Sequence, residues 1–136
     1  MQPHIEEAWR ALRLADRDIT AFHILSQEPE VHFSVACFHA QQAVEKSLKA
    51  VLFSRRIEFR RVHELTELTQ LLRQHGLETP VSDDLLGRLD PFAVTFRHDD
   101  MDVESLTRED AATWVTDVRR WAEEQVRAAA ESEPAP

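Results

Sequence analysis

The sequence predicts an all-α fold of about five helices, for three reasons. The 136 residues include only two glycines and six prolines, which leaves little material for the many turns of an all-β fold. Apolar residues recur at steps of three and four along most of the chain, the spacing of helices that bury one side. Residues 31–54 contain neither glycine nor proline, so a long uninterrupted helix is expected there. The length fits one domain, which we place at residues 1–130, followed by a disordered tail at 131–136.

The first two helices follow from the apolar pattern and from Pro29. An N-terminal helix should end before Pro29, and a second should run from Val31 to about Ser54. The second helix is the longest, so we expect it to be central. The apolar stripe of the first helix consists of Ile5, Ala8, Trp9, Leu12, Ile19 and Phe22.

The expected central helix has two distinguishable faces. One is a ridge of small side chains on which another helix can approach closely. This ridge consists of Ala36, Ala40, Ala43, Ser47 and Ala50. The other face carries a polar stripe at helical spacing, made of His39, Gln42, Lys46 and Lys49. We predict that this polar stripe binds a nucleotide or another anionic ligand, because lysine donates hydrogen bonds to anionic oxygens. The alternative is a solvated helix face on which Glu45 pairs with Lys49.

Turn and capping signals place the remaining helices. A basic connection at residues 55–61 leads to a third helix with leucines in register, which ends at Gly76. Ser82 is a suitable cap for a fourth helix, which Pro91 should kink or divide. Thr107, with an acidic residue three positions later, should start the fifth. The apolar register of the fourth helix consists of Leu85, Leu89, Phe92 and Phe96.

Charge is distributed unevenly along the chain. The net charge of −9 disfavours general binding to nucleic acid, whose phosphates attract lysine and arginine. Residues 45–61, however, hold six basic and two acidic side chains, a local balance of +4. Residues 98–136 hold eleven acidic and four basic side chains, a balance of −7. Such polarity can steer an anionic ligand or pair two subunits.

Several classes of protein are disfavoured by what the chain contains. Its single cysteine, Cys37, lies in an apolar stretch and is expected to pack as a small hydrophobic side chain. The sequence has no long apolar run typical of a membrane span, so we expect a cytoplasmic protein. Its histidines and acids do not follow a zinc-site spacing, and it has no glycine-rich phosphate loop. We therefore predict neither a metal nor a cofactor.

Residues 36–50 resemble the signature helix of the HEPN domain family. They read Ala-Cys-Phe-His-Ala-Gln-Gln-Ala-Val-Glu-Lys-Ser-Leu-Lys-Ala. Further on, His63-Glu64-Leu65 resembles the start of the family's next helix, and Phe96-Arg97-His98-Asp99 takes the place of its aromatic-Arg-Tyr-Pro segment. The resemblance spans most of the chain and implies an up-and-down helical bundle that forms homodimers. It also implies a minimal nucleotidyltransferase partner, with which such proteins form toxin-antitoxin pairs.

The nuclease members of this family carry an arginine, four to six intervening residues and then a histidine. Here Arg97 is followed directly by His98 and by no later histidine, and tyrosine is absent. We therefore expect a non-catalytic or weakly catalytic HEPN-type module that binds a nucleotide or a protein partner. The first alternative is a metal-independent ribonuclease, in which Arg97 stabilises charge on the RNA and His98 or His63 moves a proton. The second alternative is a purely structural oligomerisation module.

Overall fold

The computed structural model describes residues 1–93 and 106–133, and every regular element in these ranges is helical. The prediction of an all-α fold of about five helices is confirmed. The α-helices are α1 (Pro3–Leu25), α2 (Phe33–Ser54), α3 (Leu65–Gln74), α4 (Asp83–Gly87) and α5 (Arg108–Ser132). A short 3-10 helix, η1, spans Asp90–Phe92.

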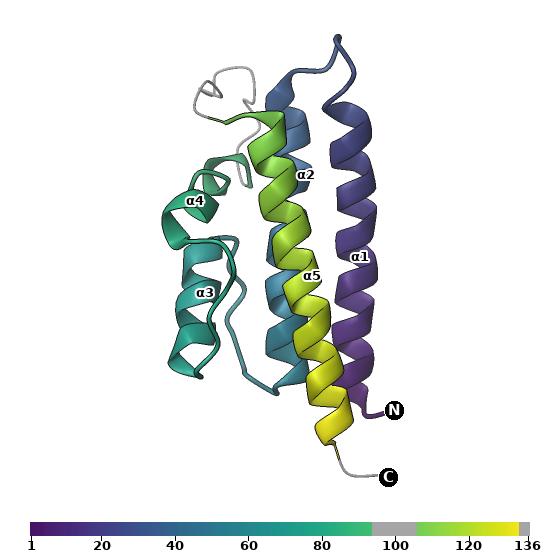
Figure 1. The fold of residues 1–136 in the computed structure, drawn as a ribbon, viewed down its shortest axis with the longest axis vertical. Helices are drawn as coiled ribbons and strands as arrows, with labels where there is room; N and C mark the ends of the chain where they lie inside the picture. Colours follow the sequence, from purple (N-terminus) through teal and green to yellow (C-terminus); the bar gives the residue numbers. More distant parts are fainter. Residues whose placement is uncertain (94–105, 134–136) are drawn as a thin grey trace.

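Three long helices form the body of the molecule (Figure 1). Helix α1 runs antiparallel to α2, and α5 lies beside both and runs in the direction of α2 (Figure 1). The smaller elements α3, α4 and η1 lie on the other side of α2 from α1 (Figure 1). Helix α2 contacts α1, α3, α5 and η1, so it is central, as the sequence predicts. The expectation that it is the longest helix is wrong, because α2 has 22 residues, against 23 in α1 and 25 in α5.

The small-residue ridge explains why α2 can be central. Each of its five members is at most 1% exposed. Small side chains let neighbouring helix backbones approach closely, which an unbroken row of leucines would prevent. Ser47 is the polar member, and its hydroxyl donates to the carbonyl of Ala43 at 2.8 Å, so its burial leaves no unmet donor.

Four helix ends follow local chemistry. The hydroxyl of Thr107 accepts from the amide of Asp110 at 3.0 Å, which confirms the predicted start of α5. The hydroxyl of Ser82 caps α4 in the same way, through the amide of Leu85 at 3.3 Å. Beyond the end of α3, Gly76 has a φ of 81°, a left-handed conformation that glycine adopts at low cost. The start of α3 is capped from a distance, because the amide of Leu65 donates to the carboxylate of Asp90 at 2.8 Å.

Two boundaries differ from the expectation or refine it. Helix α2 begins at Phe33 rather than near Val31, because Nδ1 of His32 accepts the amide of Ser34 at 3.2 Å and acts as the cap. Pro29 therefore lies in the turn between α1 and α2. The predicted fourth helix is divided into α4 and η1, and Pro91 lies within η1. Phe96, the last residue of its predicted register, lies outside the described residues.

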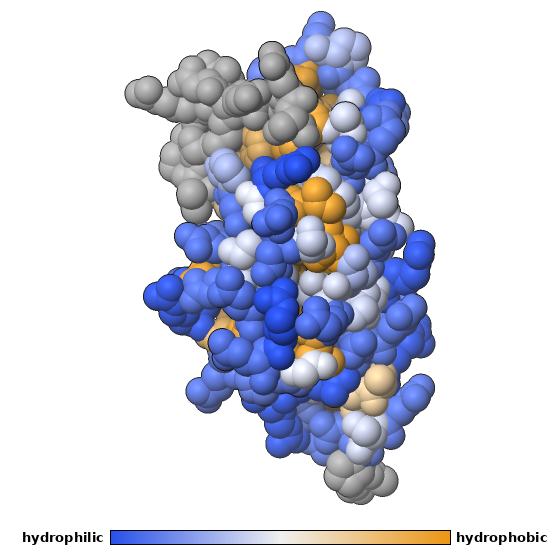
Figure 2. All heavy atoms as spheres, turned by 60° about the vertical axis from the view of Figure 1, so that its left-hand side comes forward, coloured by the Kyte–Doolittle hydropathy of each residue, from blue (hydrophilic) through white to orange (hydrophobic). Residues whose placement is uncertain are grey.

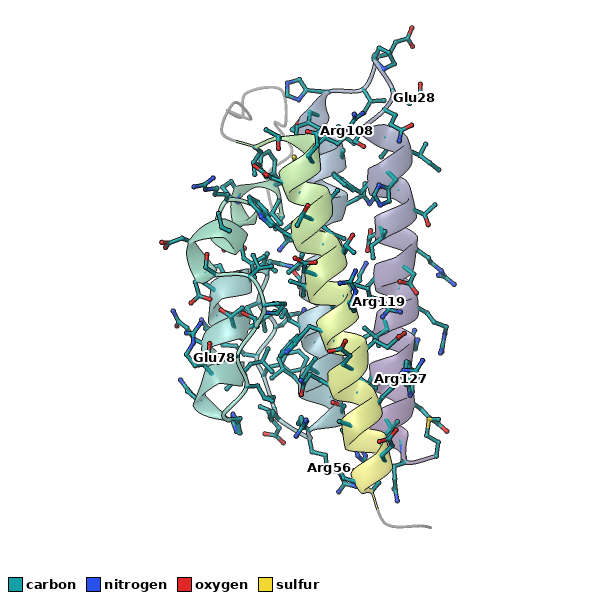
Figure 3. The ribbon with its side chains drawn as sticks, in the orientation of Figure 1. Glu28, Arg56, Glu78, Arg108, Arg119 and Arg127 are labelled. Carbon is teal, nitrogen blue, oxygen red and sulfur yellow. The ribbon has the colours of Figure 1, made fainter. Side chains whose placement is uncertain are left out.

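Helices α1 and α5 are joined by a polar and an aromatic contact. The guanidinium of Arg119 points from α5 toward α1 (Figure 3) and donates to both oxygens of Asp16, at 2.8 and 3.1 Å. About two turns further along α5, the guanidinium of Arg127 lies 5.4 Å from the ring centroid of Trp9. These contacts fix the register of α5 along α1.

Surface and interior are clearly separated in this bundle. On the face that carries α3 and α4, hydrophilic side chains cover most of the surface and apolar ones show in separate patches (Figure 2). None of the helices that the structure describes is long and apolar enough to cross a membrane. In the interior, Cys37 is fully buried, and this burial raises the pKa of its thiol to about 12. Cys37 thus packs as a small hydrophobic side chain, as predicted.

Candidate functional site

The segment between α2 and α3 brings His63 back against the middle of α2. Residues 55–64 leave the lower end of α2 and run alongside it to the start of α3 (Figure 1). The amide of the Gln41 side chain donates to the backbone carbonyl of His63 at 2.7 Å. Nδ1 of His63 lies 3.0 Å from Oε1 of Glu45. Both the backbone and the ring of His63 are therefore held by α2.

Glu45 is a buried carboxylate with three side-chain partners. Its side chain is 5% exposed, and its oxygens lie 3.0 Å from Nζ of Lys49 and 3.3 Å from the amide nitrogen of Gln41. An ionised carboxylate can only accept hydrogen bonds, so Nδ1 of His63 carries the proton and donates to it. The second ring nitrogen, Nε2, then lies on the half of the ring that faces away from Glu45. The side chain of His63 is 50% exposed, whereas that of Glu45 is 5% exposed.

A cavity of about 530 Å³ adjoins His63. One wall is the segment after α2, with two arginines beside the histidine, and the opposite wall comes from α3, α4 and η1. The lining residues are Arg60, Arg61, Val62, His63, Glu64, Glu67, Gly87, Asp90, Pro91 and Ala93. The cavity thus joins an imidazole and two guanidinium groups to a small apolar wall.

Two carboxylates that line this cavity have pKa values shifted in opposite directions. The hydrogen bonds from Arg60 to Glu67, at 2.6 and 3.2 Å, lower the pKa of Glu67. Burial raises the pKa of Asp90, and the nearby charges of Glu64 and Glu45 add to this, although the bond from the Leu65 amide opposes it. Burial thus holds the pKa of Asp90 above the ordinary value of an aspartate, and Arg60 holds the pKa of Glu67 below the ordinary value of a glutamate.

The predicted polar stripe of α2 is divided between two neighbours. Toward α1, Nδ1 of His39 lies 2.9 Å from Asp18 and Nζ of Lys46 lies 2.5 Å from the other oxygen of the same carboxylate. Toward the segment of residues 55–64, Lys49 pairs with Glu45, the pairing that the sequence offered as the alternative. Gln42 lies between them and donates to the side-chain oxygen of Gln41 at 2.8 Å. All four stripe residues are half-buried and hold partners within the chain.

The structure places the predicted catalytic residues unevenly. His63 lies at the cavity, whereas Arg97 and His98 lie outside the described residues. The sequence analysis did not identify Asp18, and it paired Glu45 with Lys49 but not with His63. Neither acid differs in sequence from the other acids of the chain in a way that marks a histidine partner. Within residues 1–93 and 106–133, no three His, Cys, Asp or Glu side chains are grouped to hold a metal ion.

Comparison with known families gives one match that covers most of the chain. A family model described as HEPN domain matches residues 4–128. Comparison with curated proteins and with solved structures gives no match. The matched range contains α2, α3, α4 and η1 in full, all of α1 except Pro3, and most of α5.

Proposed function

Because the chain belongs to the HEPN family, as the match over residues 4–128 shows, we propose that it is a nucleotide-binding helical module whose ligand lies beside His63. The observation that carries this proposal is the Glu45–His63 pair at the wall of the 530 Å³ cavity. Cavities that bind small ligands have volumes of roughly 300–1,000 Å³, so this one can hold a nucleotide.

The cavity lining suits a phosphate attached to a flat base. Arginine presents a planar fork of donors that matches phosphate oxygens, and Arg61 is exposed at the cavity wall. Nε2 of His63 can donate to a phosphate when it carries a proton, while Glu45 keeps the ring in place. Val62, Pro91 and Ala93 provide apolar contact for a base.

Calorimetry with ATP, GTP, AMP and GMP tests this proposal directly. We expect His63→Ala and Arg61→Ala each to weaken binding by about tenfold, because a hydrogen bond to a charged group contributes about 1.5–3 kcal/mol. His75→Ala is the matched control, since His75 is exposed at the end of α3 and hydrogen-bonds the carbonyl of Leu71.

Two other outcomes of that experiment would reassign the site. Loss of binding in His39→Ala and Lys46→Ala, with no effect of His63→Ala, would place the ligand on the polar stripe of α2. No binding of any of the four nucleotides would favour the purely structural oligomerisation module.

We further propose that the protein forms a homodimer in the cytoplasm and pairs with a minimal nucleotidyltransferase in a toxin-antitoxin system. The family supports this, and so does the charge asymmetry between the basic residues 45–61 and the acidic C-terminal part. Co-expression with a short nucleotidyltransferase encoded beside this protein tests the pairing. Co-elution as one complex, with its mass from light scattering, is the expected result, and separate elution would contradict it.

The Glu45–His63 pair also favours a second candidate function, metal-independent cleavage of RNA. A neutral imidazole held at Nδ1 by a carboxylate has Nε2 free of protons, so it can accept one from a ribose 2′-hydroxyl. An arginine would stabilise the charge that develops on the phosphate, and Arg97 is the candidate that the family pattern gives. RNA incubated with the protein in EDTA should then be cleaved, and Arg97→Ala, His98→Ala and His63→Ala identify which residues are required. Intact RNA with the unaltered protein would contradict this candidate.

A further inference from the structure

A second cavity lies at the opposite end of the segment that carries His63. Its volume is about 520 Å³, and it lies where α2 ends and α1 begins. Figure 3 shows Arg56 at this end of the bundle, near the end of α5. The lining residues are His4, Phe53, Arg56, Ile57, Glu58 and Phe59. The proposed nucleotide site shares none of these residues.

Two phenyl rings form the apolar part of this second cavity. The ring centroids of Phe53 and Phe59 lie 5.3 Å apart at an interplanar angle of 64°, an edge-to-face arrangement. Nζ of Lys49 lies 5.8 Å from the centroid of Phe59, and Lys49 is itself held by Glu45. The rings therefore have fixed positions before any ligand arrives, and they leave ring surface toward the cavity.

Arg56 occupies a backbone position that favours glycine. Its φ is 56°, and among the described non-glycine residues it has the only positive φ. The amide of Ile57 donates to the carbonyl of Leu52 at 3.0 Å and that of Arg56 to Phe53 at 3.1 Å, the hydrogen bonds of a glycine-type helix end. An arginine is strained in this conformation, so its side chain is a candidate for a role other than ending the helix.

The nearest polar contacts of Arg56 compete with one another. Nε2 of His4 lies 2.6 Å from a carboxylate oxygen of Glu133 and 3.4 Å from Nε of Arg56. If Nε2 donates to Glu133, it carries a proton and cannot accept from Arg56. The shorter contact, to a charged acceptor, is the stronger. The guanidinium of Arg56 therefore keeps hydrogen-bond donors that an acceptor from outside the chain can use. Among the lining residues of this cavity, Glu58 is the acid.

We propose that this second cavity binds an aromatic anion. The flat ring of the ligand packs against Phe53 and Phe59, and its carboxylate or phosphate group lies on the fork of Arg56. The inference goes beyond the proposed nucleotide site and does not depend on it, because the two cavities have separate linings.

Titration of the full chain with phenyl phosphate and with benzoate tests this inference, by calorimetry and by NMR shifts of the residue 53–59 amides. Arg56→Gly should weaken binding by about tenfold while the melting temperature stays the same or rises, since glycine relieves the left-handed strain. Arg55→Ala is the matched control, because it removes the same charge from the adjacent residue, whose guanidinium donates to Gln125. In His63→Ala, the two probes should shift the residue 53–59 amides as much as they do in the unaltered protein.

The stronger of the two probes identifies the anionic group of the natural ligand, a carboxylate or a phosphate ester. Equal binding by Arg56→Gly and the unaltered protein would overturn the inference. So would an equal loss in Arg55→Ala, which would reduce the effect to general charge, or the absence of saturable binding by both probes.

Discussion

Asp18 and Glu45 have almost the same surroundings in two different regions of the molecule. Each carboxylate is nearly buried and holds one histidine through Nδ1, at 2.9 Å for His39 and 3.0 Å for His63. Each also holds one lysine of α2, Lys46 or Lys49. The histidines differ in access: the side chain of His39 is 26% exposed in the α1–α2 interface, and that of His63 is 50% exposed at a cavity.

This difference indicates what each cluster does. A buried carboxylate needs partners to offset its loss of hydration, and both clusters supply them. In the Asp18 cluster the partners come from α2 and the acid from α1, so the pairs join two long helices. In the Glu45 cluster the same pairing fixes a ring whose outer edge faces a cavity. We therefore expect the Asp18 cluster to contribute to the stability of the fold and the Glu45 cluster to contribute to ligand binding.

The largest expected effect is on stability, in Asp18→Ala. Removing this carboxylate leaves Lys46 and His39 without their partner in a half-buried interface, and we expect a loss of about 3 kcal/mol in unfolding free energy. Urea unfolding measures it. Asp16→Ala is the control, because the side chain of Asp16 is 52% exposed, against 11% for Asp18, and its pair with Arg119 should contribute at most about 1 kcal/mol. A smaller loss in Asp18→Ala than in Asp16→Ala would contradict the comparison.

The next largest effect is expected in Glu45→Gln, which should change nucleotide affinity more than stability. Glu45→Gln keeps the size of the side chain but removes the charge that holds Nδ1 of His63. We expect nucleotide affinity to fall by about tenfold and unfolding free energy to fall by about 1 kcal/mol. Asp18→Asn should leave nucleotide affinity unchanged. If Asp18→Asn weakened binding as much as Glu45→Gln, the two clusters would not be functionally distinct.

A smaller effect concerns Asp90, the acid at the edge of the His63 cavity. Its pKa in the folded protein is raised by burial, so the stability that it contributes is present below its unfolded pKa and is lost as pH rises through the folded pKa. Asp90→Asn still accepts the amide of Leu65 and carries no charge. We expect a gain of a few tenths of a kcal/mol at pH 7, kept small by solvent screening. The gain should vanish below about pH 3.9, where both side chains are neutral.

Thermal unfolding of this variant at several pH values checks the sign. A gain that grew toward acidic pH would contradict the raised pKa of Asp90. Asp84→Asn is the control at an exposed position of α4.

The sequence predicts the helices better than it predicts the site, and particular residues show why. Spacing along α2 identifies the alanine ridge and the polar stripe correctly, because periodicity depends on one helix alone. The partner of His39 and Lys46 is Asp18, on another helix and 21 residues before His39. Periodicity says which residues share a face, but not which residue of another element lies opposite. His63 was identified through the family pattern, whereas its link to Glu45 required the path of residues 55–64.

The smallest expected effect extends the comparison to a third group of α2, the thiol of Cys37. This residue is fully buried, and burial raises its pKa to about 12, so almost no reactive thiolate exists near pH 8. We expect a thiol reagent at pH 8 to leave the folded protein unlabelled and to label it readily in urea, where the pKa returns to about 8.5. Mass spectrometry measures the labelled fraction. Rapid labelling of the folded protein would mean that this part of α2 opens to solvent. It would then weaken the conclusion that solvent access distinguishes His63 from His39, the histidine held by Asp18.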